Sequence, residues 1–176
     1  MTTTVDVASR LAALRGRPFT KMSGSGNDFV IFDGRAVPRE LVAVPEVIRA
    51  ICNRFNGIGA DGLVVLEPAA APDGGAASVR LSYFNSDGSP ADLCGNATLC
   101  STALAVRIGL APASGMTLLT GAGEVASRLP DPVSERPEIT LPPVDGLREE
   151  VEIALGPGER RIGNHGHYRR FDEGVP

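Results

Sequence analysis

The chain has 176 residues, a length that fits one domain or two small lobes. With 43% hydrophobic and 22% charged residues it has the composition of a soluble globular protein. A net charge of −4 without blocks of like charge, and without an apolar run of membrane-spanning length, argues against nucleic-acid and membrane binding. Its three widely spaced cysteines form no C-x-x-C pair, which argues against a disulfide framework or a zinc site and favours a reducing, cytoplasmic location.

The N-terminal part is predicted to contain an extension and two short strands. Residues 1–17 are expected to be the extension, with a short helix from Val7 to Leu14. Strands are predicted over Phe19–Met22 and Phe29–Asp33. The segment between them, 23–28, combines glycines with Ser and Asn, which indicates a loop with unusual backbone dihedrals.

The strongest helical pattern covers Val44–Phe55. Its apolar residues fall on one face, which ends with Phe55 and includes Cys52, so this cysteine is expected to belong to the core. The helix is expected to stop at Asn56-Gly57, because glycine follows the last apolar position. A glycine-rich loop then leads into an apolar strand, Leu63–Leu66.

A surface loop is predicted over Pro68–Ala77 and a half-buried strand over Ser78–Phe84, where Val79, Leu81 and Tyr83 share one face. The remaining predicted strands are a hairpin of Met116–Thr120 and Glu124–Leu129, followed by Glu138–Leu141 and Glu149–Leu155. Many short strands with few helices indicate an α+β domain, in which mainly antiparallel strands wrap around a helix.

The last residues, 156–176, differ from the rest of the chain. They contain both histidines, His165 and His167, and show no apolar periodicity. A His-x-His pair alone is a weak signal for a metal site. We therefore expect an unstructured end without a metal.

The most informative segment is 85–100, where a turn delivers Cys94 to the start of a predicted helix, Asn96–Ile108, which Gly109 ends. Unpaired N–H groups at a helix start favour a thiolate and also hold a carboxylate or phosphate. The competing interpretation is a small buried hydrophobe, which is what we expect of Cys100 on the apolar stripe. Because no histidine precedes position 165, a reactive Cys94 is better suited to proton transfer than to acyl transfer.

Loops rich in Asn, Asp and Gly, at 24–28, 57–62 and 85–89, have two interpretations. They are ordinary turns, or their asparagines lie beside the helix start and hold the ammonium and carboxylate of an amino acid. Gly24 and Gly26 lead into a strand rather than a helix, which excludes a dinucleotide-binding loop.

A family resemblance rests on segments that follow one another in a fixed order: Lys21–Val30 (KMSGSGNDFV), Arg54–Gly62 (RFNGIGADG), Asn85–Ser89 (NSDGS) and Cys94–Asn96 (CGN). With them the chain resembles the N-terminal lobe of diaminopimelate epimerases over residues 18–155. The resemblance implies an α+β fold of two lobes, each with strands around a central helix. It also implies a cofactor-independent isomerase of lysine and cell-wall precursor synthesis, which interconverts LL- and meso-diaminopimelate by moving the α-proton.

The resemblance also implies roles for individual residues. Cys94 matches the first of two catalytic cysteines, and Asn27 and Asn85 match asparagines that contact the substrate. Gly95 and Asn96 match helix-start residues that hold the α-carboxylate and the α-amino region. Helix-start N–H groups would stabilise the charge that develops as the α-proton leaves. Inversion without a cofactor needs an acid or base on each face of the carbon, here a thiolate and an opposing thiol.

The chain departs from the family pattern beyond this lobe. No cysteine follows Cys100, the family's second Cys-Gly and Glu-Arg segments are absent, and Leu99 stands where an arginine is usual. Gly163–His167 resembles an altered start of the second lobe, so residues 156–176 are interpreted as its remnant. We therefore expect a truncated or altered epimerase chain that cannot complete the two-base reaction by itself.

Two other functions stay open. The chain could be a non-catalytic single lobe that binds an amino-acid ligand or a partner chain, and an exposed apolar surface would then predict a homodimer. It could also be a relative with another substrate, such as a proline-type racemase or a phenazine-type isomerase. The segment Gly24–Phe29 (GSGNDF) argues against this last interpretation.

Overall fold

The computed structural model describes residues 6–70, 77–131, 133, 136–141, 151–156, 159–164 and 167–172, and side chains only up to residue 141. The chain divides into two compact units, Met1–Leu141 and Pro142–Pro176. Each unit is described by itself. Among the described residues, none of the helices is long and apolar enough to cross a membrane.

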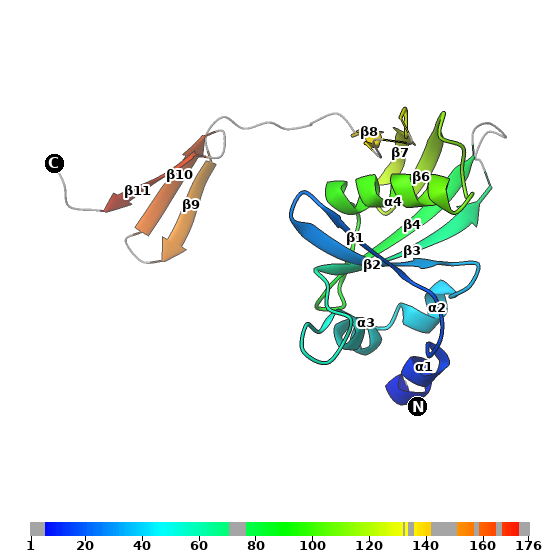
Figure 1. Cartoon of the computed structure of the whole chain (residues 1–176). Coiled ribbons are helices and arrows are strands. Elements are labelled where there is room, and N and C mark those ends of the chain that lie inside the picture. Colours follow the sequence, from blue (N-terminus) through cyan, green and yellow to red (C-terminus); the bar gives the residue numbers. More distant parts are fainter. Residues whose placement is uncertain are drawn as a thin grey trace. The chain divides into compact units, whose positions relative to one another are not determined.

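The first unit contains one curled, eight-stranded sheet (Figure 1). Its strands are β1 (Thr20–Gly24), β2 (Asn27–Asp33), β3 (Gly62–Ala69), β4 (Ser78–Asn85), β5 (Pro90–Ala91), β6 (Met116–Thr120), β7 (Gly123–Arg128) and β8 (Glu138–Thr140). The order is β1-β2-β3-β4-β6-β7-β8, with β5 on β4. Only the β2–β3 and β4–β6 pairs are parallel among these strands, so the predicted, mainly antiparallel α+β fold is confirmed.

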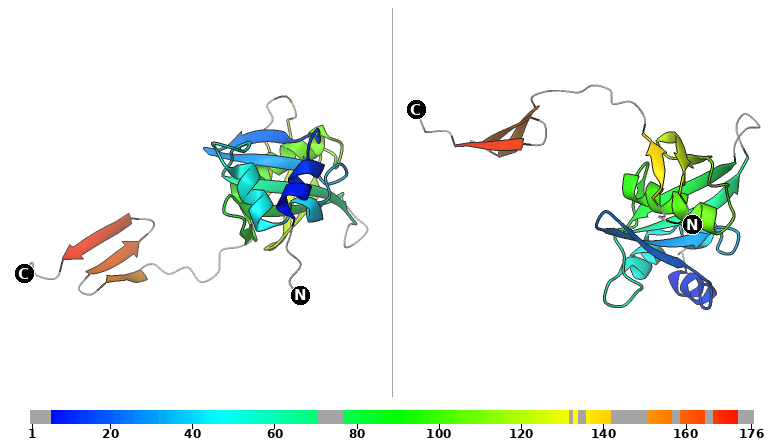
Figure 2. Two further views of the ribbon diagram at one scale, coloured as in Figure 1. Left: turned by 90° about the horizontal axis from the view of Figure 1, so that it is seen from below. Right: turned by 45° about the horizontal axis from the view of Figure 1, so that its top comes forward.

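Helix α4 (Gly95–Arg107) lies inside the curl of the sheet, as the turned views in Figure 2 show. It contacts β1, β2, β3, β4 and β8. Its inward face joins a core that includes Phe29, Leu66 and Leu118, all fully buried. Cys100 also belongs to this core, as predicted. The helix ends where Gly109 adopts φ +69°, a left-handed conformation that glycine accepts without strain, so the predicted end is also confirmed.

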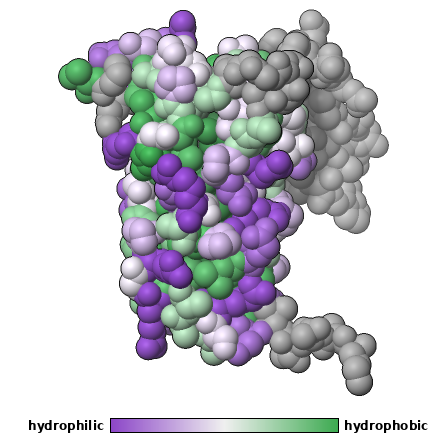
Figure 3. Space-filling view, turned by 90° about the vertical axis from the view of Figure 1, so that its right-hand side faces the viewer, coloured by the Kyte–Doolittle hydropathy of each residue, from purple (hydrophilic) through white to green (hydrophobic). Residues whose placement is uncertain are grey.

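The opposite face of β2 and β3 is covered by α1 (Val7–Ala13), α2 (Arg39–Val42) and α3 (Pro45–Cys52) (Figure 1). A second core fills this layer, and Cys52 is part of it, as predicted. Strand β3 is buried on both faces, which explains why its sequence reads as a continuous apolar run. Figure 3 shows hydrophilic residues spread over one side of the molecule rather than gathered in one block.

The prediction that Phe55 extends the apolar face of this helix is wrong, because α3 ends at Cys52 and Phe55 is 94% exposed. Asn53 leaves the helical conformation, and its side-chain oxygen accepts hydrogen bonds from the N–H groups of Phe55 (2.8 Å) and Asn56 (2.9 Å). This turn competes with a further helical turn. The chain then folds back, and the N–H groups of Ile58 and Gly59 cap the carbonyl of Ile51.

Two predicted loops are shorter than expected. The loop 23–28 is a tight hairpin, in which β1 and β2 pair up to Gly24 and Asn27. The turn residues Ser25 and Gly26 both have positive φ, +51° and +91°, as the favoured two-residue hairpin turns require. Strand β3 continues to Ala69, so Pro68 belongs to a strand, while residues 71–76 of the predicted loop lie outside the described residues.

The second unit is a three-stranded antiparallel sheet of β9 (Val151–Gly156), β10 (Glu159–Asn164) and β11 (His167–Asp172). The expectation of an unstructured end is therefore wrong. Backbone groups alone make an antiparallel ladder, so an apolar pattern is not required to form one. His167 begins β11, and His165 lies outside the described residues.

Candidate functional site

The predicted site residues gather at one end of the curled sheet, where several chain turns meet the start of α4. Asn96 Nδ2 donates to Asn27 Oδ1 at 2.8 Å, which joins the helix to the β1–β2 hairpin. The N–H of Asp61 donates to the carbonyl of Asp28 (2.9 Å), and the N–H of Ser86 donates to the carbonyl of Asp61 (3.0 Å). Segments far apart in sequence are therefore held side by side.

Cys94 occupies the N-cap position of α4 with extended backbone angles, φ −134° and ψ 112°. Its side chain is partly buried against the core. The N–H of Thr98 donates to the carbonyl of Cys94 at 2.9 Å and is the first to bond within the helix. The N–H groups before Thr98, including those of Gly95 and Asn96, have no acceptor within the helix. The first turn of the helix holds no acidic residue. This helix start has the properties of an anion site next to a thiol.

The space around Gly95 is open. A Cβ placed there would meet no other atom within 4 Å, apart from its immediate neighbours and the helix backbone. Gly95 therefore leaves room for a ligand to approach the N–H groups of the helix start.

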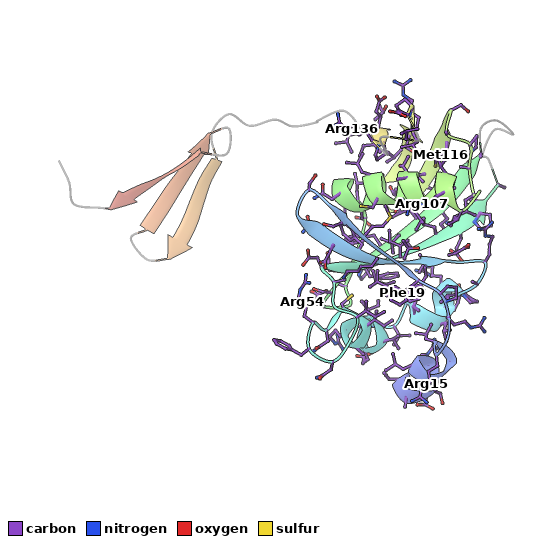
Figure 4. The ribbon with its side chains drawn as sticks, viewed as in Figure 1. Arg15, Phe19, Arg54, Arg107, Met116 and Arg136 are labelled. Carbon is purple, nitrogen blue, oxygen red and sulfur yellow. The ribbon has the colours of Figure 1, made fainter. Side chains whose placement is uncertain are left out.

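A carboxylate cluster, made of Lys21, Asp28, Arg54 and Asp61, holds the hairpin that carries Asn27. Arg54 donates to Asp28 Oδ1 at 2.7 Å and to Asp61 Oδ1 at 2.8 Å, and Lys21 pairs with Asp28 at 2.8 Å. The Arg54 hydrogen bond holds the pKa of Asp28 well below its usual range. Hydrogen bonds from the Asp28 N–H and from Asn27 lower the pKa of Asp61. Figure 4 shows Arg54 on the loop after α3, on the side where the β1–β2 hairpin turns.

Asp61 also fixes the side chain of Asn27. Its Oδ2 accepts from Asn27 Nδ2 at 3.2 Å and from the N–H of Asp28 at 3.1 Å. Because an ionised carboxylate only accepts, the Asn27 amide must turn its nitrogen to Asp61 and its oxygen to Asn96. The order of donors along these side chains is therefore determined.

Asn85 lies in a second chain of hydrogen bonds, which consists of Tyr83, Asn85, Ser89 and Asp87. The Tyr83 hydroxyl donates to Asn85 Oδ1 at 3.1 Å, and Asn85 Nδ2 donates to Ser89 Oγ at 3.0 Å. Burial, followed by the charge of Cys94 and a hydrogen bond to its side chain, raises the pKa of Tyr83 to about 12. The Tyr83 hydroxyl and Ser89 together fix the orientation of the Asn85 amide.

The structure thus brings Asn27 into direct contact with Asn96, and places Asn85 in a hydrogen bond with Tyr83. The roles of the predicted residues remain predictions. Sequence reasoning missed Tyr83, which it placed on an apolar strand face, and gave no role to Asp61. The signals that were available are a phenol two residues before Asn85, and an aspartate inside the Arg54–Gly62 segment.

The arrangement suits the binding of a small amino acid and the movement of a proton. N–H groups at the helix start donate to a carboxylate, side-chain amides offer donors and acceptors, and the thiol of Cys94 stands at the N-cap of the same helix. Among the residues whose side chains are described, His, Cys, Asp and Glu form no group of three that would hold a metal ion.

Comparison of the sequence with known proteins identifies relatives that belong to one family. The family model described as diaminopimelate epimerase matches residues 19–135. The diaminopimelate epimerase of Gemmatimonas aurantiaca is 56% identical over 146 residues, which are 82% of this chain and 50% of that protein. That of Desulforudis audaxviator is 41% identical over 140 residues, which are 78% of this chain and 43% of that protein. The chain therefore spans about half the length of the curated relatives it matches.

A solved structure supports the same fold. The probable proline racemase from Agrobacterium radiobacter K84 superimposes with a TM-score of 0.56 at 19% identity, over 82% of this chain and 48% of that one. At this identity the likeness concerns the fold alone.

Proposed function

This chain belongs to the diaminopimelate epimerase family, and we propose that it carries one face of a site that interconverts LL- and meso-diaminopimelate by cofactor-independent proton transfer. Cys94 is the acid/base group. Asn27, Asn85, Gly95 and Asn96 hold the α-carboxylate and α-amino groups of the substrate. According to this proposal, the protein is an isomerase of lysine biosynthesis.

The observation that carries the proposal is the position of Cys94 at the start of α4, next to Gly95 and the Asn96–Asn27 contact. The α-proton of an amino acid is very weakly acidic, so its removal needs stabilisation of the charge left behind. N–H groups at a helix start, bound to the α-carboxylate, meet that charge where it develops. A thiolate at the adjacent N-cap would then reach the α-carbon.

The proton balance of the step is simple. The Cys94 thiolate forms an S–H bond as the α-C–H bond breaks, and the electron pair spreads from the α-carbon into the carboxylate. Inversion follows when an acid on the opposite face returns a proton to the α-carbon. Cys52 and Cys100 are buried in the two cores, and burial raises the pKa of Cys52 to about 11. Neither cysteine suits the opposing role, so we assign this chain only the Cys94 face.

We also propose that the protein works in the cytoplasm. The support is that Cys52, Cys94 and Cys100 are all free thiols, which suits a reducing compartment. Pairing into a homodimer stays a prediction, for which light scattering is the direct measurement.

The experiment that tests the function is solvent-deuterium incorporation at the α-carbon of diaminopimelate, followed by NMR in D₂O. We expect Cys94→Ala to abolish incorporation. The matched control is Cys52→Ala, which removes a buried thiol on the other face of the sheet and should lower stability with little effect on exchange.

Equal loss of incorporation in both variants would contradict the role of Cys94. If the wild-type chain gives no incorporation, addition of diaminopimelate should still perturb the NMR signals of the Asn27 and Asn96 side chains. Perturbation without incorporation would indicate a binding-only lobe. The absence of both effects in a folded chain would refute the proposed function.

A further inference from the structure

Asn85 lies at the same end of the sheet as Asn27, the other strand-end asparagine of the candidate site. In the registers of the sheet, Asn85 on β4 lies opposite Gly62 on β3, and Gly62 lies beside Phe29 on β2. Asn27 precedes Phe29 by two residues, which is the period of one strand face. Phe29 belongs to the core around α4, so both asparagines lie on the face of the sheet that surrounds this helix.

The turn that follows Asn85 is anchored to α3. Gly88 has φ +89°, and a Cβ at this position would lie 2.6 Å from the Cα of Pro45, so the turn needs a glycine there. Arg49 donates to the carbonyl oxygen of Asp87 at 2.9 Å. Within the turn, the N–H of Gly88 donates to the carbonyl of Asn85 at 2.9 Å. The backbone that carries the Asn85 side chain is therefore held against a helix.

The side chains of this turn form hydrogen bonds in one direction, which the carboxylate of Asp87 determines. Asp87 Oδ1 accepts from the N–H of Ser89 at 2.8 Å and from its hydroxyl at 2.6 Å. These hydrogen bonds lower the pKa of Asp87 and keep it ionised near neutral pH. Because an ionised carboxylate only accepts, the single proton of the Ser89 hydroxyl points to Asp87. Ser89 Oγ can then only accept from Asn85, so the atom 3.0 Å from it is the amide nitrogen.

The oxygen of the Asn85 amide meets a donor at the other end. With its nitrogen at Ser89, Asn85 turns Oδ1 toward the Tyr83 hydroxyl, 3.1 Å away. Packing places this phenol, because its ring lies edge-on to Phe29 and a Cβ at Gly62 would lie 3.0 Å from its oxygen. A flipped amide would put its oxygen against Ser89 Oγ, which has no proton left to donate.

We propose that Asp87 and Ser89 are positioning residues for Asn85: the carboxylate commits the proton of the hydroxyl, and the hydroxyl holds the amide in one orientation. The second N–H of the Asn85 amide and the second lone pair of its oxygen are then left for a ligand. This inference rests on the proposed function, in which Asn85 contacts the substrate. Asn27 is held in a similar way by Asp61, so a carboxylate orients each of the two strand-end asparagines.

The test is the exchange of the Asn85 side-chain NH₂ protons with solvent, measured by NMR on the full chain without a ligand. Ser89→Ala removes the hydroxyl and keeps the backbone hydrogen bonds of the turn. We expect the Asn85 NH₂ to exchange about fivefold faster, as the loss of one hydrogen bond between neutral groups predicts. Ser89→Thr restores a hydroxyl and should return exchange to within about twofold of the original rate.

Two further variants separate the carboxylate from the anchor of the turn. Asp87→Ala should also accelerate exchange, because the released Ser89 hydroxyl can donate to Asn85 Oδ1 and let the amide flip. Glu46→Ala is the matched control. Glu46 pairs with Arg49 at 2.6 Å, so its loss loosens the anchor on α3 but leaves the Asp87 carboxylate and the Ser89 hydroxyl in place. We expect the exchange of the Asn85 NH₂ to be unchanged in this control.

Tyr83→Phe examines the oxygen end of the amide. The variant removes the donor to Asn85 Oδ1 and leaves the bond from Nδ2 to Ser89. We expect the ¹³Cγ signal of Asn85 to move to lower chemical shift, because its carbonyl loses a hydrogen bond, while NH₂ exchange keeps its rate. Faster exchange with an unmoved ¹³Cγ signal would show the opposite orientation and refute the proposal.

Unchanged NH₂ exchange in folded Ser89→Ala would overturn the proposal, as would an equal acceleration in Glu46→Ala, which would indicate that only the anchor of the turn matters. Should Ser89→Ala fail to fold, the Tyr83→Phe spectrum decides, because its two signals report the orientation of the amide by themselves. None of these measurements uses a substrate, so a failure here and a failure of the epimerase assignment are distinguishable.

Discussion

At the scale of single residues, Asp61 is the group that determines which atoms the asparagines of the site present to a ligand. It accepts from Asn27, and Asn27 accepts from Asn96, so the Asn96 amide turns its nitrogen inward. The side-chain oxygen of Asn96 is then available as an acceptor, which suits an α-ammonium group. Asp61 thus orients the Asn96 amide through Asn27.

We predict that Asp61→Ala releases the Asn27 amide. Its side-chain amide protons should exchange with solvent about tenfold faster, because a hydrogen bond to a charged acceptor is lost. Exchange of the Asn27 NH₂ signals in NMR spectra measures this directly. Asp33→Ala is the control, since Asp33 pairs with Arg35 at 2.6 Å and stands at the opposite end of β2 from Asn27. Unaltered exchange in Asp61→Ala would contradict the assigned role.

The sequence predicts some of these residues and not others for a physical reason. Cys94, Asn27 and Asn85 stand in turns and at a helix start, where their residue types already indicate local chemistry. Tyr83 stands in an alternating strand, where a ring reads as core. The role of its hydroxyl becomes visible only in the structure, from the hydrogen bond to Asn85 and from the space that Gly62 leaves for the ring.

At the scale of elements, the carboxylate cluster fastens three segments to one another: β1 through Lys21, β2 through Asp28, and the loop after α3 through Arg54 and Asp61. The pKa values of Asp28 and Asp61 are lower in the folded chain than the ordinary aspartate value. Their stabilisation is therefore complete above the unfolded pKa of about 4 and is lost as the pH falls through the folded values.

We predict that the free energy of unfolding falls as the pH drops below about 4, and that Arg54→Ala makes this decline smaller, a modest effect because Arg54 is exposed and its ion pairs are screened by solvent. Urea unfolding between about pH 2 and pH 7 measures the effect. Arg128→Ala, which breaks the exposed Arg128–Glu138 pair (2.6 Å) elsewhere on the unit, should leave the pH dependence unchanged. A similar change in both variants would count against the carboxylate cluster.

The boundaries of the elements show where the hydrophobic pattern of the sequence does not by itself predict the structure. The helix pattern over Val44–Phe55 is correct in type but extends past Cys52, because Asn53 offers its side chain to the N–H groups that a further turn would use. Residues 156–176 show no apolar period, yet β10 and β11 form there by backbone pairing. Both failures occur where local hydrogen bonding, which hydrophobic periodicity does not record, decides the structure.

At the scale of the whole molecule, the first unit has two cores of its own. Among the residues whose side chains are described, the members of the core that surrounds α4, and of the core beneath α3, lie between Val7 and Ile139. The site is built from the same unit, since its hydrogen bonds join residues from Lys21 to Asn96. Stability and site geometry should therefore both survive the removal of the second unit.

We predict that a chain ending at Leu141 unfolds within a few degrees of the melting temperature of the full chain, and keeps the NMR signals of the Asn27 and Asn96 side chains unchanged. Removal of β8 is a different change, because β8 contacts α4 and Ile139 packs against its core. A chain ending at Leu129 should accordingly melt about 5–10 °C lower, the effect expected for loss of one to two kcal/mol in a domain of this size. Thermal unfolding followed by circular dichroism compares the three chains. A chain ending at Leu141 that does not fold would show that the second unit contributes to the first, whereas equal melting of the two shortened chains would show that β8 does not support α4.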